Sequence, residues 1–231
     1  MDNIEEIIER LNQWNEEGRF AEVNADVSTL LTTVLDDDDA DDVASLYVLK
    51  GNAEYGLGRF EDALKSYAKA IELDTFDVQA RCNYGSTLYT LGRYVDALNA
   101  CDAAILTDEE FAPAYINVAN FLVDLKHEEE AVYALQQAFS IEPNDANLGR
   151  TVADMATDLE NFDVALDAYI ETAQLPDTQE DIFQATYDMF MKFKNHPDVP
   201  QSQWLEGINK WRAKFPTNPA VIRFSGELMR G

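Results

Sequence analysis

Few residues in this chain of 231 have the types and spacing that chemistry requires. The only histidines are His127 and His196, and the only cysteines are Cys82 and Cys101. No serine or cysteine is placed by the sequence as a nucleophile that either histidine would activate. We therefore expect no catalytic residues, no cofactor and a protein that is not an enzyme.

An acidic run is the remaining candidate for chemistry. Asp36–Asp39 are followed by Asp41 and Asp42. A calcium-binding EF-hand loop needs alternating oxygen ligands, a central glycine and a closing glutamate, and this run has none of that pattern. We expect a solvated loop whose carboxylates repel one another, and no metal site.

A spacing of 34 residues dominates the rest of the chain. It brings back the same or similarly small residues in four columns: Leu57, Leu91, Leu125 and Leu159; Ala63, Ala97, Ala131 and Ala165; Ala70, Ala104 and Ala138; and Gly51, Gly85, Ala119 and Ala153. A fixed period of this length indicates stacked supersecondary units. Small side chains let two helix axes approach closely, so these columns predict the positions where helices cross.

Each unit is predicted to be a pair of helices. In the unit 44–77, a first apolar-periodic run ends at Gly58, and a second extends from Glu61 to about Leu73. Glycine suits the left-handed conformation that ends a helix, and the second helix begins a few residues later.

The residues of this unit resemble the tetratricopeptide repeat signature. The matching positions are Gly51, Tyr55, Leu57, Gly58, Phe60, Ala63, Tyr67, Ala70 and Leu73. The resemblance implies an all-α fold, a right-handed α-solenoid of tandem helix pairs. Lys126 and Glu160 depart from it because they replace the turn glycine, and Arg81 and Gly149 stand where a bulky apolar residue is usual.

The resemblance predicts a single domain over residues 1–231. Its parts are a diverged amino-terminal helix pair at 1–35, repeats at 44–77, 78–111, 112–145 and 146–177, and diverged capping helices at 178–231. Caps are expected because the terminal repeats of a solenoid would otherwise expose an apolar face.

In this family the first helix of each unit lines a concave groove that contacts a peptide. The resemblance therefore implies a non-catalytic scaffold or adaptor. Carried over by register, the groove residues are Asn52, Tyr55, Cys82, Asn83, Ser86, Tyr89, Ile116, Asn117, Asn120 and Arg150. An asparagine amide both donates and accepts hydrogen bonds, so a row of asparagines can pair with the main chain of a peptide. Two alternatives stay open: a secretion-type chaperone dedicated to one client, and a self-assembly module.

The formal net charge of −27 restricts the partners. It repels nucleic acids and anionic membranes, and it attracts a basic protein or peptide. The carboxylates are spread over every predicted helix, so we rank solubility or salt adaptation ahead of partner binding as the reason for them. We expect a monomer, although the sequence does not decide the oligomeric state.

The cell compartment follows from what the chain lacks. No run approaches the roughly 20 apolar residues of a membrane span, so no membrane insertion is predicted. The first residues are acidic where a signal peptide would be basic, and the cysteines form no disulfide framework. We expect a cytoplasmic protein.

Overall fold

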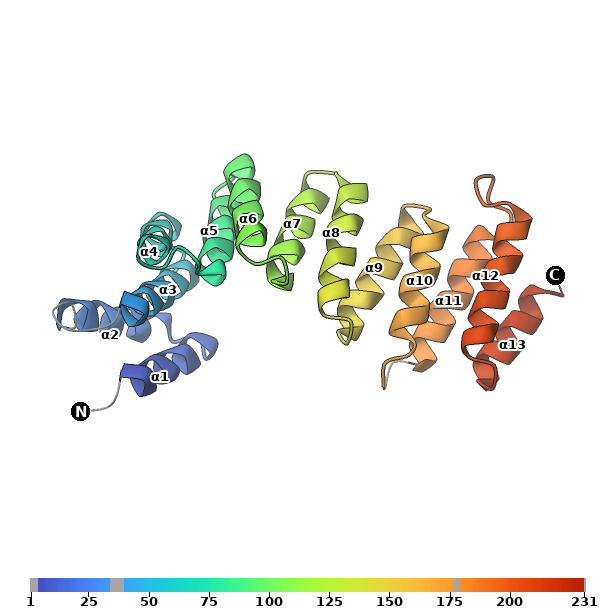
Figure 1. The fold of residues 1–231 in the computed structure, drawn as a ribbon, viewed down its shortest axis with the longest axis horizontal. Helices are drawn as coiled ribbons and strands as arrows, with labels where there is room; N and C mark the ends of the chain where they lie inside the picture. The colour runs from blue at the N-terminus through green and yellow to red at the C-terminus, as the bar shows by residue number, and fades with distance from the viewer. Residues whose placement is uncertain (1–3, 34–39, 177–178, 231) are drawn as a thin grey trace. The chain divides into compact units, whose positions relative to one another are not determined.

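The computed structural model describes residues 4–33, 40–176 and 179–230. These ranges form thirteen α-helices and no strand, which confirms the predicted all-α helical-repeat fold (Figure 1). The helices are α1 (Ile4–Glu16), α2 (Phe20–Thr33), α3 (Ala40–Gly56), α4 (Phe60–Leu73), α5 (Val78–Thr90), α6 (Tyr94–Thr107), α7 (Ala112–Asp124), α8 (Glu128–Ile141), α9 (Ala146–Asp158), α10 (Phe162–Thr172), α11 (Gln179–Phe193), α12 (Gln201–Lys214) and α13 (Pro219–Leu228).

Two compact units divide the chain, Met1–Phe121 and Leu122–Gly231, with the boundary inside α7. Within the first unit, α3 packs on α4 and α5 packs on α6 as successive pairs. Within the second unit, α9 packs on α10 in the same way. The single domain of residues 1–231 and the right-handed course of the whole array stay predictions.

The small-residue columns lie where the paired helices pack. Ala63 and Ala97 in the first unit, and Ala131 and Ala165 in the second, are all fully buried. At Gly51 a Cβ atom would lie 2.5 Å from Cε1 of Tyr67, so only glycine lets α3 approach that ring. Short side chains at a fixed spacing therefore set the distance between helices, as the sequence predicted.

The turn inside each pair uses left-handed backbone at one repeated position. Gly58 and Gly92 have φ angles of 73° and 75°, and Lys126 and Glu160 have φ angles of 66° and 60°. The two non-glycine residues thus keep the turn geometry although they depart from the family pattern. They do so against the steric preference of residues that carry a Cβ atom.

Local packing also accommodates Gly149, where the family pattern has a bulky residue. The glycine is buried, and a Cβ atom built there would lie 2.7 Å from Cζ of Phe139. The ring of Phe139 therefore occupies the space that a larger residue at 149 would fill.

The amino-terminal pair has its own apolar core. Leu11 of α1, Val23 and Val27 of α2, and Leu46 of α3 are all fully buried in one cluster. Helix α3 begins at Ala40, so Asp41 and Asp42 lie in its first turn and not in the acidic loop that we predicted. Asp36–Asp39, the rest of that loop, lie outside the described residues.

Aromatic side chains form the core of the carboxyl-terminal helices. Phe183 and Phe190 of α11 and Trp211 of α12 are almost fully buried, and the rings of Phe190 and Trp211 have centroids 5.6 Å apart. Nε1 of Trp204 donates to the Phe190 carbonyl oxygen over 2.9 Å. Bulky rings thus replace the alanine crossings used by the regular pairs.

Candidate functional site

The candidate site lies on α3, α5 and α7, the first helices of three successive pairs. Asp77 sets the start of α5, because its side chain accepts a hydrogen bond from the Ala80 backbone N–H. Nine of the ten predicted groove residues lie on these helices, within the first unit. We name the inner-helix face by eight of them: Asn52, Tyr55, Asn83, Ser86, Tyr89, Ile116, Asn117 and Asn120.

Hydrogen bonds join α3 to α5 across this face. Nδ2 of Asn83 donates to Oδ1 of Asn52 over 3.0 Å. The same Oδ1 atom accepts a bond of 2.8 Å from the hydroxyl of Tyr67 on α4. On α5, Nε2 of Gln79 donates to Oδ1 of Asn83 over 2.8 Å. Both asparagine amides are therefore held in fixed orientations by neighbouring helices.

A second set of bonds joins α5 to α7. Nδ2 of Asn117 donates to Oγ of Ser86 over 2.8 Å and to Sγ of Cys82 over 2.9 Å. Asn83 and Asn117, one period apart, thus make the same kind of contact with the preceding inner helix.

Cys82 differs from the other predicted groove residues because only 2% of it is exposed. A hydrogen bond from the Cys101 thiol, and then the one from Asn117, lower the pKa of Cys82. The same thiol–thiol bond and burial raise the pKa of Cys101. The Cys82 side chain lies beneath the surface, so we leave it out of the inner-helix face.

Aromatic rings provide the apolar part of the face. The Tyr89 ring stacks on that of Phe121, with centroids 4.1 Å apart and planes within 5°. Tyr55 is 39% exposed, and its hydroxyl lies 3.1 Å from Oγ1 of Thr90. Ile116 is half-buried and Asn120 is exposed. Sequence reasoning missed Thr90, because a threonine near a helix end has no motif to mark it.

Arg150 lies in the second unit, on α9, and the structure does not bring it together with the other nine residues. Its Nε atom is 3.5 Å from Oδ2 of Asp154, one turn later. The hydroxyl of Tyr169 donates to Oδ1 of the same carboxylate over 2.6 Å. Arg150 is therefore already partnered by an acidic neighbour.

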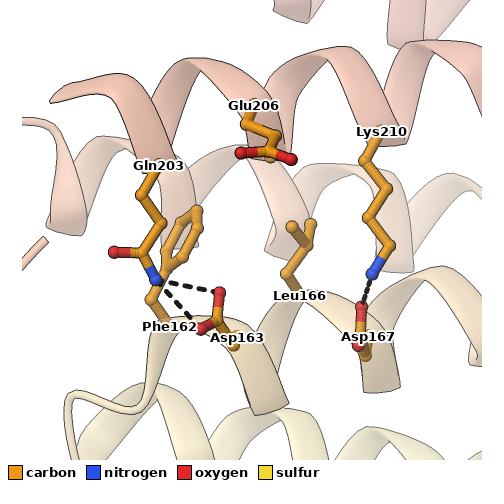
Figure 2. Close-up of a pocket in the computed structure, with 8 residues that line it drawn as sticks. Phe162, Asp163, Leu166, Asp167, Gln203, Glu206 and Lys210 are labelled. Carbon is orange, nitrogen blue, oxygen red and sulfur yellow. Dashed lines mark hydrogen bonds and ion pairs between the residues drawn. The ribbon is translucent and has the colours of Figure 1, made fainter. Parts of the chain in front are cut away.

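The second unit also contains a pocket of 320 Å³ between α10 and α12, which the sequence did not indicate (Figure 2). Nε2 of Gln203 donates to Oδ2 of Asp163 over 2.9 Å, and Nζ of Lys210 pairs with Oδ1 of Asp167. The partners are more than 40 positions apart or close to it, and no motif links them. Since these polar groups bond one another across the pocket, they mainly tie α10 to α12.

Two further observations concern the described ranges. No helix formed by residues 4–33, 40–176 or 179–230 is long and apolar enough to cross a membrane. In the same ranges, no three histidine, cysteine or acidic side chains gather as metal donors.

Comparison with known families agrees with the repeat geometry. Two models described as tetratricopeptide repeat match residues 48–116 and 112–145. The chain contains tetratricopeptide repeats. Both matches fall on the tetratricopeptide units that carry the inner-helix face and on the pair that follows them. No curated protein sequence matches this chain significantly.

Solved tetratricopeptide structures share the fold at low sequence identity. YrrB, described as a tetratricopeptide protein with an unusual peptide-binding site, is 20% identical, with a TM-score of 0.54 over 83% of this chain and 95% of its own. The pilF protein of Pseudomonas aeruginosa is 17% identical, with a TM-score of 0.60 over 97% of both chains. A repeat protein of Cytophaga hutchinsonii is 12% identical, with a TM-score of 0.65 over 90% of this chain and 79% of its own.

Proposed function

We propose that this protein is a non-catalytic scaffold or adaptor that binds a peptide segment of a partner protein along the inner-helix face. Tetratricopeptide repeats are generally a protein-interaction fold, and the presence of such repeats supports the broad class. YrrB, which shares the fold, is described as having a peptide-binding site, and this supports the choice of a peptide as ligand.

The observation that carries the proposal is the state of the asparagine amides. Asn52 uses Oδ1 and Asn117 uses Nδ2 in bonds between helices. Within the part of the chain that the structure describes, Nδ2 of Asn52, Oδ1 of Asn117 and the whole amide of Asn120 have no hydrogen-bond partner. These donors and acceptors are complementary to a peptide main chain. Because the other half of two amides is already fixed, little side-chain freedom is lost on binding.

Charge enters the proposal at long range. None of the eight residues of the inner-helix face is ionised, although the chain has a net charge of −27. The overall field would attract a basic partner and speed its encounter. The contact itself would then use neutral amides and the rings of Tyr55 and Tyr89. We keep the cytoplasm as the proposed compartment.

Two exposed asparagines allow a matched test. Asn120 lies on α7, on the inner-helix face, whereas Asn99 lies on α6, an outer helix of the same unit. Asn120→Trp and Asn99→Trp place the same bulky ring at these positions. We expect Asn120→Trp to lower recovery of the partner from native lysate at least tenfold, measured by quantitative mass spectrometry, and Asn99→Trp to leave it unchanged. Equal recovery with both variants would contradict the proposed surface.

A further inference from the structure

Positive charge is concentrated near the carboxyl-terminal end of the sequence. Residues 189–231 contain seven of the 17 lysines and arginines but only three of the 44 acidic residues. This segment therefore carries a formal charge of +4, while residues 1–188 carry −31. Such segregation departs from the even spread of carboxylates that the sequence analysis assumed.

The cations of this segment lie exposed on α12 and α13. They are Arg212, Lys214, Arg223 and Arg230. Their contacts are with uncharged groups: Nη1 of Arg212 lies 3.5 Å from Sδ of Met229, the Arg223 guanidinium lies 4.4 Å from the Phe224 ring centroid, and Nε of Arg230 donates to the Gly226 carbonyl oxygen. Among the described residues none of the four forms an ion pair, in a chain rich in carboxylates.

Apolar side chains lie beside these cations. Ile222 is 52% exposed and Met229 is 41% exposed, and their separation of seven residues puts them on one face of α13. A pocket of 300 Å³ adjoins Ile222 and includes Arg212 and Phe215 in its lining, which contains no carboxylate. We name Arg212, Lys214, Ile222, Arg223, Met229 and Arg230 the basic surface. It suits an acidic segment that also has apolar side chains.

The chain itself contains such a segment in α1. Glu6, Glu9 and Glu16 are exposed and spaced for one helical face, and within the described residues they have no ion-pair partner. Ile7 and Ile8, on the same helix, are only partly buried. Residues 1–42 contain 14 acidic residues and two arginines.

We propose that the basic surface of one copy binds the acidic face of α1 in a second copy. Charge complementarity favours this occupant over a nucleic acid or an anionic membrane, because the −31 of residues 1–188 repels extended polyanions. At 0.15 M salt, charges beyond about 8 Å are screened, so the net repulsion between copies is weak while close ion pairs persist. The contact joins two different surfaces, so copies add in series unless the series closes into a ring.

Light scattering on the full-length protein at 0.15 M salt tests this self-association. The wild-type mass should rise above 26.0 kDa as concentration increases. Arg212→Glu with Arg223→Glu should remain monomeric at every concentration. The control Lys65→Glu with Lys69→Glu changes the charge by the same amount on α4 of the first unit and should associate like the wild type. Circular dichroism establishes that each variant is folded.

Complementary charge reversal identifies the second surface. Glu6→Lys with Glu9→Lys should also remain monomeric alone. Mixed with the Arg212→Glu and Arg223→Glu variant, it should form a one-to-one complex of about twice the monomer mass, because the reversed surfaces again attract each other. A wild-type mass that does not change with concentration, association that survives either reversal, or a mixture that stays monomeric would each overturn the proposal. None of these results would alter the expected effect of Asn120→Trp on partner recovery.

Discussion

Asn83 on α5 donates a hydrogen bond from Nδ2 to Oδ1 of Asn52 on α3 over 3.0 Å. One period later, Asn117 on α7 donates to Ser86 on α5 over 2.8 Å. The asparagines at this register therefore connect successive inner helices as well as facing outward. Their replacement should affect the stability of the array in addition to the binding proposed for the face.

Asn83→Ala should lower the free energy of unfolding by about 1 kcal/mol, because it removes bonds to Asn52 and Gln79. Asn120 is exposed and bonds to none of the described residues, so Asn120→Ala should change stability by less than about 0.5 kcal/mol. Urea unfolding followed by circular dichroism measures both. Equal losses would show that the bond between α3 and α5 contributes nothing to stability.

The crossing at Ala97 should not tolerate a larger side chain. Ala97 is fully buried, and Ala97→Leu should destabilise the protein by about 1–3 kcal/mol through overpacking. Ala68 on α4 is exposed, so Ala68→Leu provides the same chemical change without the crowding. Thermal unfolding of the two variants should differ clearly. A wild-type melting temperature for Ala97→Leu would mean that the column does not set the helix spacing.

Lys126 holds left-handed backbone, with φ at 66°, that its Cβ atom disfavours. Lys126→Gly should therefore raise the free energy of unfolding by up to about 1 kcal/mol. The reverse change, Gly92→Ala, places a Cβ atom at φ of 75° in open space, so it should cost about 1 kcal/mol through backbone strain alone. Urea midpoints test the pair, and effects of the same sign would be inconsistent with this explanation.

High pH should destabilise the protein through two buried tyrosines. Burial raises the pKa of Tyr67 and Tyr169 above the ordinary value of 10.0, and the bond to Asp154 adds to this for Tyr169. The unfolded state therefore loses these protons first, so the stability is present below pH 10 and is lost as pH rises further. At pH 11 each tyrosine should cost about 1.4 kcal/mol.

The variant Tyr67→Phe with Tyr169→Phe should lose less stability between pH 9 and pH 11 than the wild type does. The comparison uses the change with pH, because the phenylalanines also remove hydrogen bonds at every pH. Tyr133 is exposed, and Tyr133→Phe serves as the control with a wild-type slope. Urea midpoints at the two pH values provide the measurement, and identical slopes for all three proteins would refute the argument.

The sequence predicted the repeated pairs because their packing is local and periodic. Ala63 and its counterparts mark crossings that recur every 34 residues, and Gly58 marks a turn that only a few conformations allow. The same regularity located α3, α5 and α7, and with them the positions of Asn83 and Asn117.

Contacts without a period escaped prediction. The burial of Cys82 depends on Cys101 and Asn117, which reach it from two other helices. The pocket between α10 and α12 depends on pairs such as Gln203 with Asp163, 40 residues apart. Composition averaged over the chain also concealed the basic surface, because an excess of carboxylates elsewhere hides a local excess of cations.

Site-specific photo-crosslinking tests the inner-helix face most directly. A photoreactive phenylalanine analogue at position 120, and the same analogue at position 99 as control, would be irradiated in native lysate and the products mapped by mass spectrometry. The proposal predicts that one partner segment is crosslinked at position 120 and not at position 99. Crosslinks to that partner from position 99 alone, or equally from both positions, would contradict binding along α3, α5 and α7.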